Sequence, residues 1–128
     1  MNLRQILAAT ALFSIASMAQ ALEVLPYTPA AFQAAQQAKQ TTALHFHADW
    51  CSVCRNQSMA LEQLKSDPAL KDVTVFKVNY DTEKALRKEL KIRSQSVFVV
   101  YQGSEERTRL AGETDREKIK AGLRPGGL

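Results

Sequence analysis

The two cysteines of this chain stand three positions apart, and the residues around them limit the folds that the chain can adopt. Cys51 and Cys54 are the only cysteines among 128 residues. The segment from residue 42 to residue 48 is short and mostly apolar, which predicts a strand. From Cys51 onward, apolar residues recur with the 3.6-residue period of a helix. The sequence therefore places both thiols where a strand runs into the first turn of a helix.

This position favours ionisation of a thiol. An unperturbed thiol has a pKa of about 8.5 and gives little thiolate at neutral pH. Unpaired N–H groups and the helix dipole stabilise an anion at a helix N-terminus, and Arg55 adds positive charge within one turn. We expect Cys51 to attack a partner's disulfide and Cys54, on the same helix face, to resolve the mixed disulfide. The intervening Ser52 and Val53 tune the reduction potential.

Other interpretations of the cysteines remain open. A structural disulfide closing so small a ring would stabilise the fold by only roughly 2 kcal/mol. A metal-binding or copper-delivery protein could use Cys51, Cys54, His45 and His47, a full ligand set for zinc or copper, although histidines usually follow the cysteines in zinc patterns. A non-catalytic partner-binding module is disfavoured because both thiols remain. The redox interpretation needs no bound cofactor, because the cysteine pair itself carries the electrons.

The N-terminus predicts a secretory signal peptide over residues 1–21. Arg4 precedes an apolar run from Ile6 to Ala19, and Ala19-Gln20-Ala21 is typical of a cleavage site. The run is too short and too rich in Ala and Ser for a good membrane span. In a bacterium, cleavage after Ala21 would place residues 22–128 in the periplasm as one domain.

The charge distribution argues against a nucleic-acid partner. The formal net charge is +4, and loss of Arg4 with the signal peptide would leave +3. No cluster of Lys and Arg accompanies this excess, so we interpret it as a contribution to solubility. Nothing in the sequence demands more than a monomer.

The rest of the chain predicts alternating helices and strands, and hence an α/β fold with a mixed central sheet flanked by helices. Thr114 and Glu117 form a capping-box pattern that would open the last helix. Expected helices span residues 29–39, 51–65, 82–90 and 114–123, and expected strands span 42–48, 73–79, 97–101 and 107–111.

The sequence around the cysteines resembles a known family. The stretch Phe46-His47-Ala48-Asp49-Trp50-Cys51-Ser52-Val53-Cys54-Arg55 is similar to the active site of the thioredoxin superfamily. Within this stretch, the sequence Ala-Asp-Trp-Cys is most similar to that of periplasmic members, such as the C-terminal domain of the transmembrane thiol:disulfide reductase of Gram-negative bacteria. The likeness continues through residues 73–81, 92–100 and 110–112.

The resemblance implies a thioredoxin fold and a thiol:disulfide oxidoreductase, acting on protein thiols and disulfides as a reductase or electron relay. It also implies a membrane thiol-electron transporter as the donor. Trp50 would shield the disulfide and contact partners. His45 stands where thioredoxins carry a buried aspartate, so we predict that His45 accepts the proton of Cys54.

Ser96 is the second departure from the family pattern, because thioredoxins carry a cis-proline there. A cis bond before a residue other than proline costs roughly 2.5–4 kcal/mol, so we predict a trans Gln95–Ser96 bond. The Ser96 hydroxyl could then donate to the Cys51 thiolate. Gln95 and Ser96 would line a partner groove of altered shape.

Overall fold

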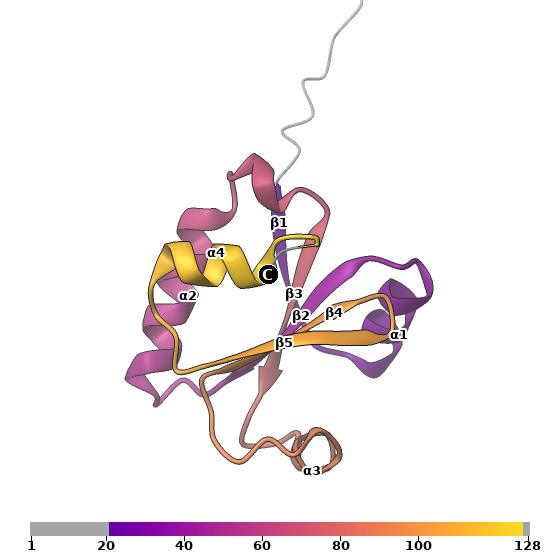
Figure 1. The fold of residues 1–128 in the computed structure, drawn as a ribbon. Coiled ribbons are helices and arrows are strands. Elements are labelled where there is room, and N and C mark those ends of the chain that lie inside the picture. Colours follow the sequence, from indigo (N-terminus) through magenta and orange to yellow (C-terminus); the bar gives the residue numbers. More distant parts are fainter. Residues whose placement is uncertain (1–20, 127–128) are drawn as a thin grey trace, which may run out of the picture.

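The computed structural model describes residues 21–126, in which a central sheet lies between two layers of helices (Figure 1). The expected α/β class is confirmed. The strands are β1 (Leu22–Pro26), β2 (Thr41–His47), β3 (Val73–Asn79), β4 (Val97–Gln102) and β5 (Glu105–Ala111). The helices are α1 (Pro29–Gln37), α2 (Ser52–Leu64), α3 (Lys84–Leu90) and α4 (Arg116–Leu123), with a 3₁₀ turn at Pro68–Leu70.

The sheet is mixed, as predicted, and its strand order is β1-β3-β2-β4-β5. Strands β1, β3 and β2 run parallel, whereas β4 runs antiparallel to both β2 and β5. The sequence did not predict β1. This strand has five residues and pairs with β3 alone, from Leu22 opposite Val73 to Pro26 opposite Lys77.

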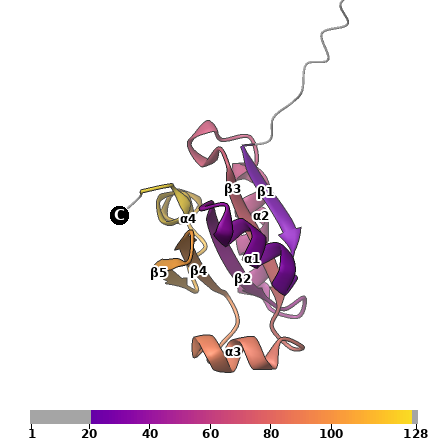
Figure 2. The ribbon, with the colours of Figure 1, turned by 90° about the vertical axis from the view of Figure 1, so that its right-hand side faces the viewer.

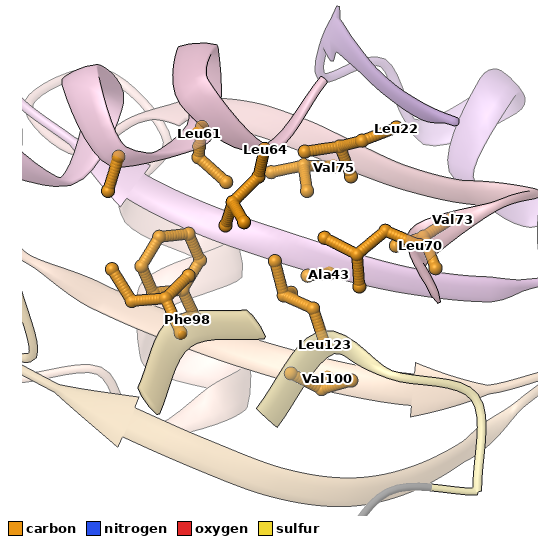
Figure 3. Close-up of a cluster of buried hydrophobic side chains, with 12 residues drawn as sticks. Leu22, Ala43, Leu61, Leu64, Leu70, Val73, Val75, Phe98, Val100 and Leu123 are labelled. Carbon is orange, nitrogen blue, oxygen red and sulfur yellow. The ribbon is translucent and has the colours of Figure 1, made fainter. Parts of the chain in front are cut away.

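Side chains of the central strands alternate between two apolar cores, one on each face of the sheet. On one face, α2 and α4 cover a core that includes Ala43, Leu61 and Phe98 (Figure 3). On the other face, α1 and α3 cover Leu44 and Phe46 (Figure 2). The predicted alternation in β2 is therefore confirmed, and it directs His45 towards the α2 side.

Helix starts follow local capping rules, with one correction. The Thr28 hydroxyl accepts the N–H of Ala31 and Pro29 opens α1, as the sequence predicts. The capping box at Thr114 is wrong by one residue. Asp115 caps α4 instead, because its carboxylate accepts the N–H of Lys118 at 2.9 Å.

The predicted signal peptide lies outside the described residues, apart from Ala21. The N–H groups of Ala21 and Leu22 both donate to the Lys65 carbonyl, at 3.0 and 3.3 Å. This contact fastens the start of β1 to the end of α2. Between residues 21 and 126, no helix has the length and apolar character that a membrane crossing requires.

Candidate active site

Cys51 stands at the N-cap position of α2, as the sequence predicts. Its backbone is extended, and its Sγ accepts a hydrogen bond from the N–H of Cys54 at 3.2 Å. A sulfur in this position satisfies one of the unpaired N–H groups of the first turn and faces the positive end of the helix dipole. The backbone therefore stabilises a thiolate on Cys51.

Cys54 lies one turn further along α2 and is less accessible. Its exposed fraction is 0%, against 6% for Cys51, and both residues are free thiols. A partner disulfide approaching from solvent therefore meets Cys51 first. This difference in exposure supports the order of events expected from the sequence, in which Cys51 attacks and Cys54 resolves.

Ser96 completes the site from the loop before β4. Its Oγ lies 3.1 Å from the Sγ of Cys51 and 3.1 Å from the Sγ of Cys54. The described chain holds no cis peptide bond, which confirms the predicted trans Gln95–Ser96 bond. Ser96 adopts a left-handed φ of 68°, which a residue with a Cβ rarely does. Its hydroxyl is thus placed where it can donate to either sulfur.

The two thiols differ in pKa. Burial opposes ionisation of Cys51, but hydrogen bonds from Cys54, from the Ser96 hydroxyl and from the side chain of Gln95 outweigh it and lower the pKa of the Cys51 thiol. Burial raises the pKa of Cys54, and so does its hydrogen bond to Cys51. Cys51 therefore ionises first while Cys54 keeps its proton, as an attacking and a resolving thiol require.

His45 lies buried beneath the helix start. Its Nε2 is 2.8 Å from the Oε1 of Gln57, and its ring stacks on Phe98. Burial lowers its pKa to about 4, so the imidazole is neutral at pH 7. Its hydrogen-bond partner is Gln57, and the role of proton acceptor for Cys54 stays a prediction.

Gln57 is the site residue that sequence reasoning missed. Its side chain is fully buried, and its amide nitrogen donates to the carbonyl oxygens of Ser96 and Glu113, at 3.0 Å each. A signal was present in the sequence. Gln57 stands three positions after Cys54 and four before Leu61, on the face of α2 that is otherwise apolar.

Arg55 and His47 act on the loop before α2. The Arg55 guanidinium donates to the carbonyl of Asp49 at 2.9 Å, and the Nε2 of His47 lies 2.9 Å from the carboxylate of the same residue. Arg55 thus braces the loop that leads into Cys51, and its positive charge binds a carbonyl oxygen there.

The alternative metal ligands do not come together as a site. Over residues 21–126, no group of three or more His, Cys, Asp or Glu side chains is arranged to hold a metal ion. Instead, the Nε2 of His45 is bound to Gln57 and that of His47 to Asp49. The four residues Cys51, Cys54, His45 and His47 therefore form no common coordination sphere in this structure.

The fold and the site agree with a match to a family model. The model described as Thioredoxin matches residues 23–125, which is most of the chain. This chain belongs to the thioredoxin family. Its CxxC pair at a helix start makes it a thiol:disulfide oxidoreductase, and thioredoxin-like proteins act on the thiols and disulfides of other proteins.

Solved structures support the same assignment. The crystal structure of Trxlp from Edwardsiella tarda is 37% identical, with a TM-score of 0.76, over 80% of this chain and 100% of that one. The thioredoxin of Malassezia sympodialis is 22% identical over 79% of this chain and 90% of its own, with a TM-score of 0.68. Mitochondrial thioredoxin 3 of Saccharomyces cerevisiae is 18% identical over 79% and 92%, with a TM-score of 0.64. The last two show the fold alone.

Trp50 dominates the surface beside Cys51 in this thioredoxin. Its side chain is 61% exposed, and its indole N–H donates to the carboxylate of Asp81 at 2.9 Å. Ser52 and Val53, between the cysteines, are also exposed. Trp50 also lines a pocket of about 410 Å³, together with Val24, Leu25, Pro26, His47, Ala48, Asp49, Lys77, Val78, Asn79 and Asp81.

Proposed function

We propose that this thioredoxin works as a reductase or electron relay in the periplasm. The observation that carries the direction of electron flow is the set of groups around the Cys51 thiolate. Those that lower its pKa are the Cys54 thiol and N–H, the Ser96 hydroxyl and the Gln95 amide, all of them neutral. His45 is neutral as well, since its pKa is about 4.

Neutral donors favour a reducing couple. Strong stabilisation of the reduced thiolate makes a dithiol oxidising, as in proteins whose thiol pKa is about 3.5 and whose potential is about −120 mV. A moderately lowered pKa, near 7, accompanies potentials of about −270 mV. Burial opposes ionisation of Cys51, and the Arg55 guanidinium binds the Asp49 carbonyl, so the groups that lower the pKa of the Cys51 thiol carry no full positive charge. This environment supports a reductase.

The reaction takes place in two exchanges. The Cys51 thiolate attacks one sulfur of a partner disulfide, and the other partner sulfur leaves as a thiolate and takes up a proton. Cys54 then attacks the Sγ of Cys51, the second partner sulfur leaves, and it takes up the proton that Cys54 gives up. Two electrons have passed to the partner, and Cys51 and Cys54 are joined in a disulfide. A donor dithiol restores them by the reverse sequence, and no bound cofactor takes part.

The location and the donor rest on the sequence. The segment from Arg4 to Ala21 has the pattern of a cleavable signal peptide. The sequence from Ala48 to Cys51 resembles that of periplasmic members of the family. We infer a membrane thiol-electron transporter as donor, because a dithiol in an oxidising compartment needs a partner that keeps it reduced. We further propose that the chain acts as a monomer.

The reduction potential of the Cys51–Cys54 pair tests the direction. The protein is equilibrated with glutathione or dithiothreitol redox buffers under metal-free conditions, and its free thiols are counted after alkylation. We expect a value near −270 mV. A value above about −200 mV would instead make the chain a disulfide donor.

Two further measurements test the metal alternative and the donor. The titration is repeated with one equivalent of copper or zinc, with the double variant C51S/C54S as the metal-binding control. A reduction potential that metal does not change supports the redox function. If one equivalent of metal keeps the thiols from reacting in the titration, the cysteines are metal ligands and the redox function is wrong.

Alkylation of periplasmic extracts tests the donor. It should find the Cys51–Cys54 pair reduced in normal cells and oxidised in cells that lack the membrane transporter. A pair that stays reduced in those cells would refute this donor.

A further inference from the structure

One hydroxyl serves two sulfurs in this site. The Oγ of Ser96 lies 3.1 Å from the Sγ of both Cys51 and Cys54. A hydroxyl has one proton to donate and lone pairs with which to accept. With Cys51 ionised, Ser96 donates to Cys51 and accepts from the S–H of Cys54. Once Cys51 is bonded to the partner in a mixed disulfide, the Ser96 hydroxyl can rotate and donate its proton to the Sγ of Cys54.

The backbone of Ser96 has to be held for this geometry to persist. Its left-handed φ of 68° is strained for a residue with a Cβ. The Ser96 N–H donates to Phe46 and the Ser96 carbonyl accepts from the N–H of Gly112, both at 2.8 Å. These bonds fix Ser96 to the sheet and to the loop after β5.

The third contact comes from the helix that carries the cysteines. The amide nitrogen of Gln57 donates to the Ser96 carbonyl at 3.0 Å, and Gln57 lies one turn after Cys54 on the same face of α2. This contact therefore sets the position of Ser96 relative to the sulfurs, whereas the backbone bonds set it relative to the sheet.

The orientation of the Gln57 amide follows from its partners. Two carbonyl oxygens, those of Ser96 and Glu113, require both amide protons. The Oε1 is then left to accept, so the Nε2 of His45, 2.8 Å away, carries the imidazole proton. His45 holds Gln57 in the orientation that binds Ser96.

We propose that Gln57 is a positioning residue of the dithiol site: it holds Ser96 so that the Ser96 hydroxyl donates to whichever sulfur is the thiolate, first Cys51 and then Cys54. The proposal rests on thiol–disulfide exchange at these cysteines and holds for either direction of electron flow. In the second exchange Cys54 forms a bond to the Sγ of Cys51, the bond to the partner sulfur breaks, and the Cys54 proton goes to that departing sulfur. Ser96 stabilises the charge on Cys54 as its proton leaves.

A double-mutant cycle separates positioning from structural support. The variants are Ser96→Ala, which removes the hydroxyl, Gln57→Met, which removes the amide at similar volume, and the two combined. Gln63→Met is the matched control, because Gln63 is exposed on the same helix. The readouts are the pKa of Cys51, from thiolate absorbance, and the rate at which Cys54 resolves a preformed mixed disulfide.

We expect Ser96→Ala to raise the pKa of Cys51 by about 1, since a hydrogen bond to a charged group is lost, and to slow resolution about tenfold. Gln57→Met should shift both quantities in the same direction, and the double variant should match Ser96→Ala alone. Gln63→Met should leave both unchanged. Additive effects, or an unchanged pKa in Gln57→Met, would overturn the proposal.

Folding and activity controls keep the outcome interpretable. If Gln57→Met fails to fold, Gln57→Asn replaces it, because the shorter side chain is neutral and its amide cannot span the distance between His45 and the Ser96 carbonyl. The same criteria then apply to that variant. Failure of the oxidoreductase function itself would appear separately, as exchange activity that survives Cys51→Ser.

Discussion

The imidazole of His45 stacks on the ring of Phe98, with centroids 4.3 Å apart and planes inclined by 14°. A ring enclosed in this way is difficult to protonate, and burial lowers the pKa of His45 from 6.5 to about 4. A histidine in an unfolded chain titrates near 6.5. The folded and unfolded states therefore bind different numbers of protons below neutral pH.

Stability should fall as the pH falls from 6.5 to 4. In this range the unfolded chain binds a proton at His45 that the folded chain excludes, so the free energy of unfolding decreases, by up to about 3 kcal/mol from this group. Urea unfolding of the reduced protein at several pH values measures the slope. The variant His45→Gln keeps an N–H for Gln57 and does not titrate, so its slope should be smaller. Equal slopes in the two proteins would contradict the assignment.

His45→Ala should slow the second exchange, in which Cys54 gives up its proton. This expectation follows from the alignment of His45 with the position of the family's buried aspartate. Single-turnover release of a chromogenic thiol from the mixed disulfide, followed from pH 5 to pH 9, gives the rate and its profile. A profile that matches the parent protein would rule out His45 as the proton acceptor.

The roles of the two cysteines should separate cleanly in single variants. Cys51→Ser should abolish exchange with protein disulfides, because Cys54 has an exposed fraction of 0%. Cys54→Ser should still attack and should accumulate a stable mixed disulfide with partners, visible by non-reducing electrophoresis and mass spectrometry. Trapping through Cys54 in the Cys51→Ser variant would reverse the order proposed for the reaction.

Trp50 should report the redox state of the pair by fluorescence. It is the only tryptophan in the chain, directly precedes Cys51, and donates to Asp81 at 2.9 Å.

The variant Asp81→Asn weakens the hydrogen bond from Trp50 to Asp81. We therefore expect KM for a protein disulfide to rise several-fold. The reduction potential should stay within about 10 mV of the parent value, which is a small free-energy change. Asp72→Asn, a carboxylate remote from the site, is the control. A changed reduction potential with an unchanged KM would contradict this expectation, because Asp81 would then act on the thiols and not on partner binding.

The mature chain should begin at Leu22. The pattern Ala19-Gln20-Ala21 predicts cleavage there, and the Leu22 side chain is fully buried at the start of β1. Intact-mass measurement of protein released from the periplasm gives the site directly. Cleavage within β1, at or beyond Val24, would contradict the prediction and should lower the melting temperature.

The sequence predicted an element correctly where the residues of that segment alone determine its secondary structure. The apolar run of β2, the helix that begins after Cys51 and the Thr28 cap are all local patterns, and each lies within two residues of its predicted place. The strand β1 was missed because its five residues owe their structure to β3, far along the chain. The cap of α4 was assigned to Thr114 because two adjacent residues can both cap, and only the backbone angles select Asp115.

The candidate site divides in the same way. Cys51, Cys54 and Ser96 were predicted, and the structure brings all three together. Gln57 was missed because a buried glutamine is recognisable only through partners that come from other parts of the fold, here β2 and the loops around β4 and β5. Its place on an apolar helix face was the only sign in the sequence.

The single neighbour of β1 in the sheet also sets an order of assembly. Leu22 pairs with Val73 and Pro26 with Lys77, so this strand has no partner until more than half of the chain has been made. Whether the polypeptide emerges from a ribosome or from a membrane channel, β1 stays unpaired while β2 and α2, which follow it in the chain, form. Closing so long a loop makes the pairing of β1 with β3 slower than pairing between neighbouring segments, so the sheet gains its edge strand β1 only after β3 is in place.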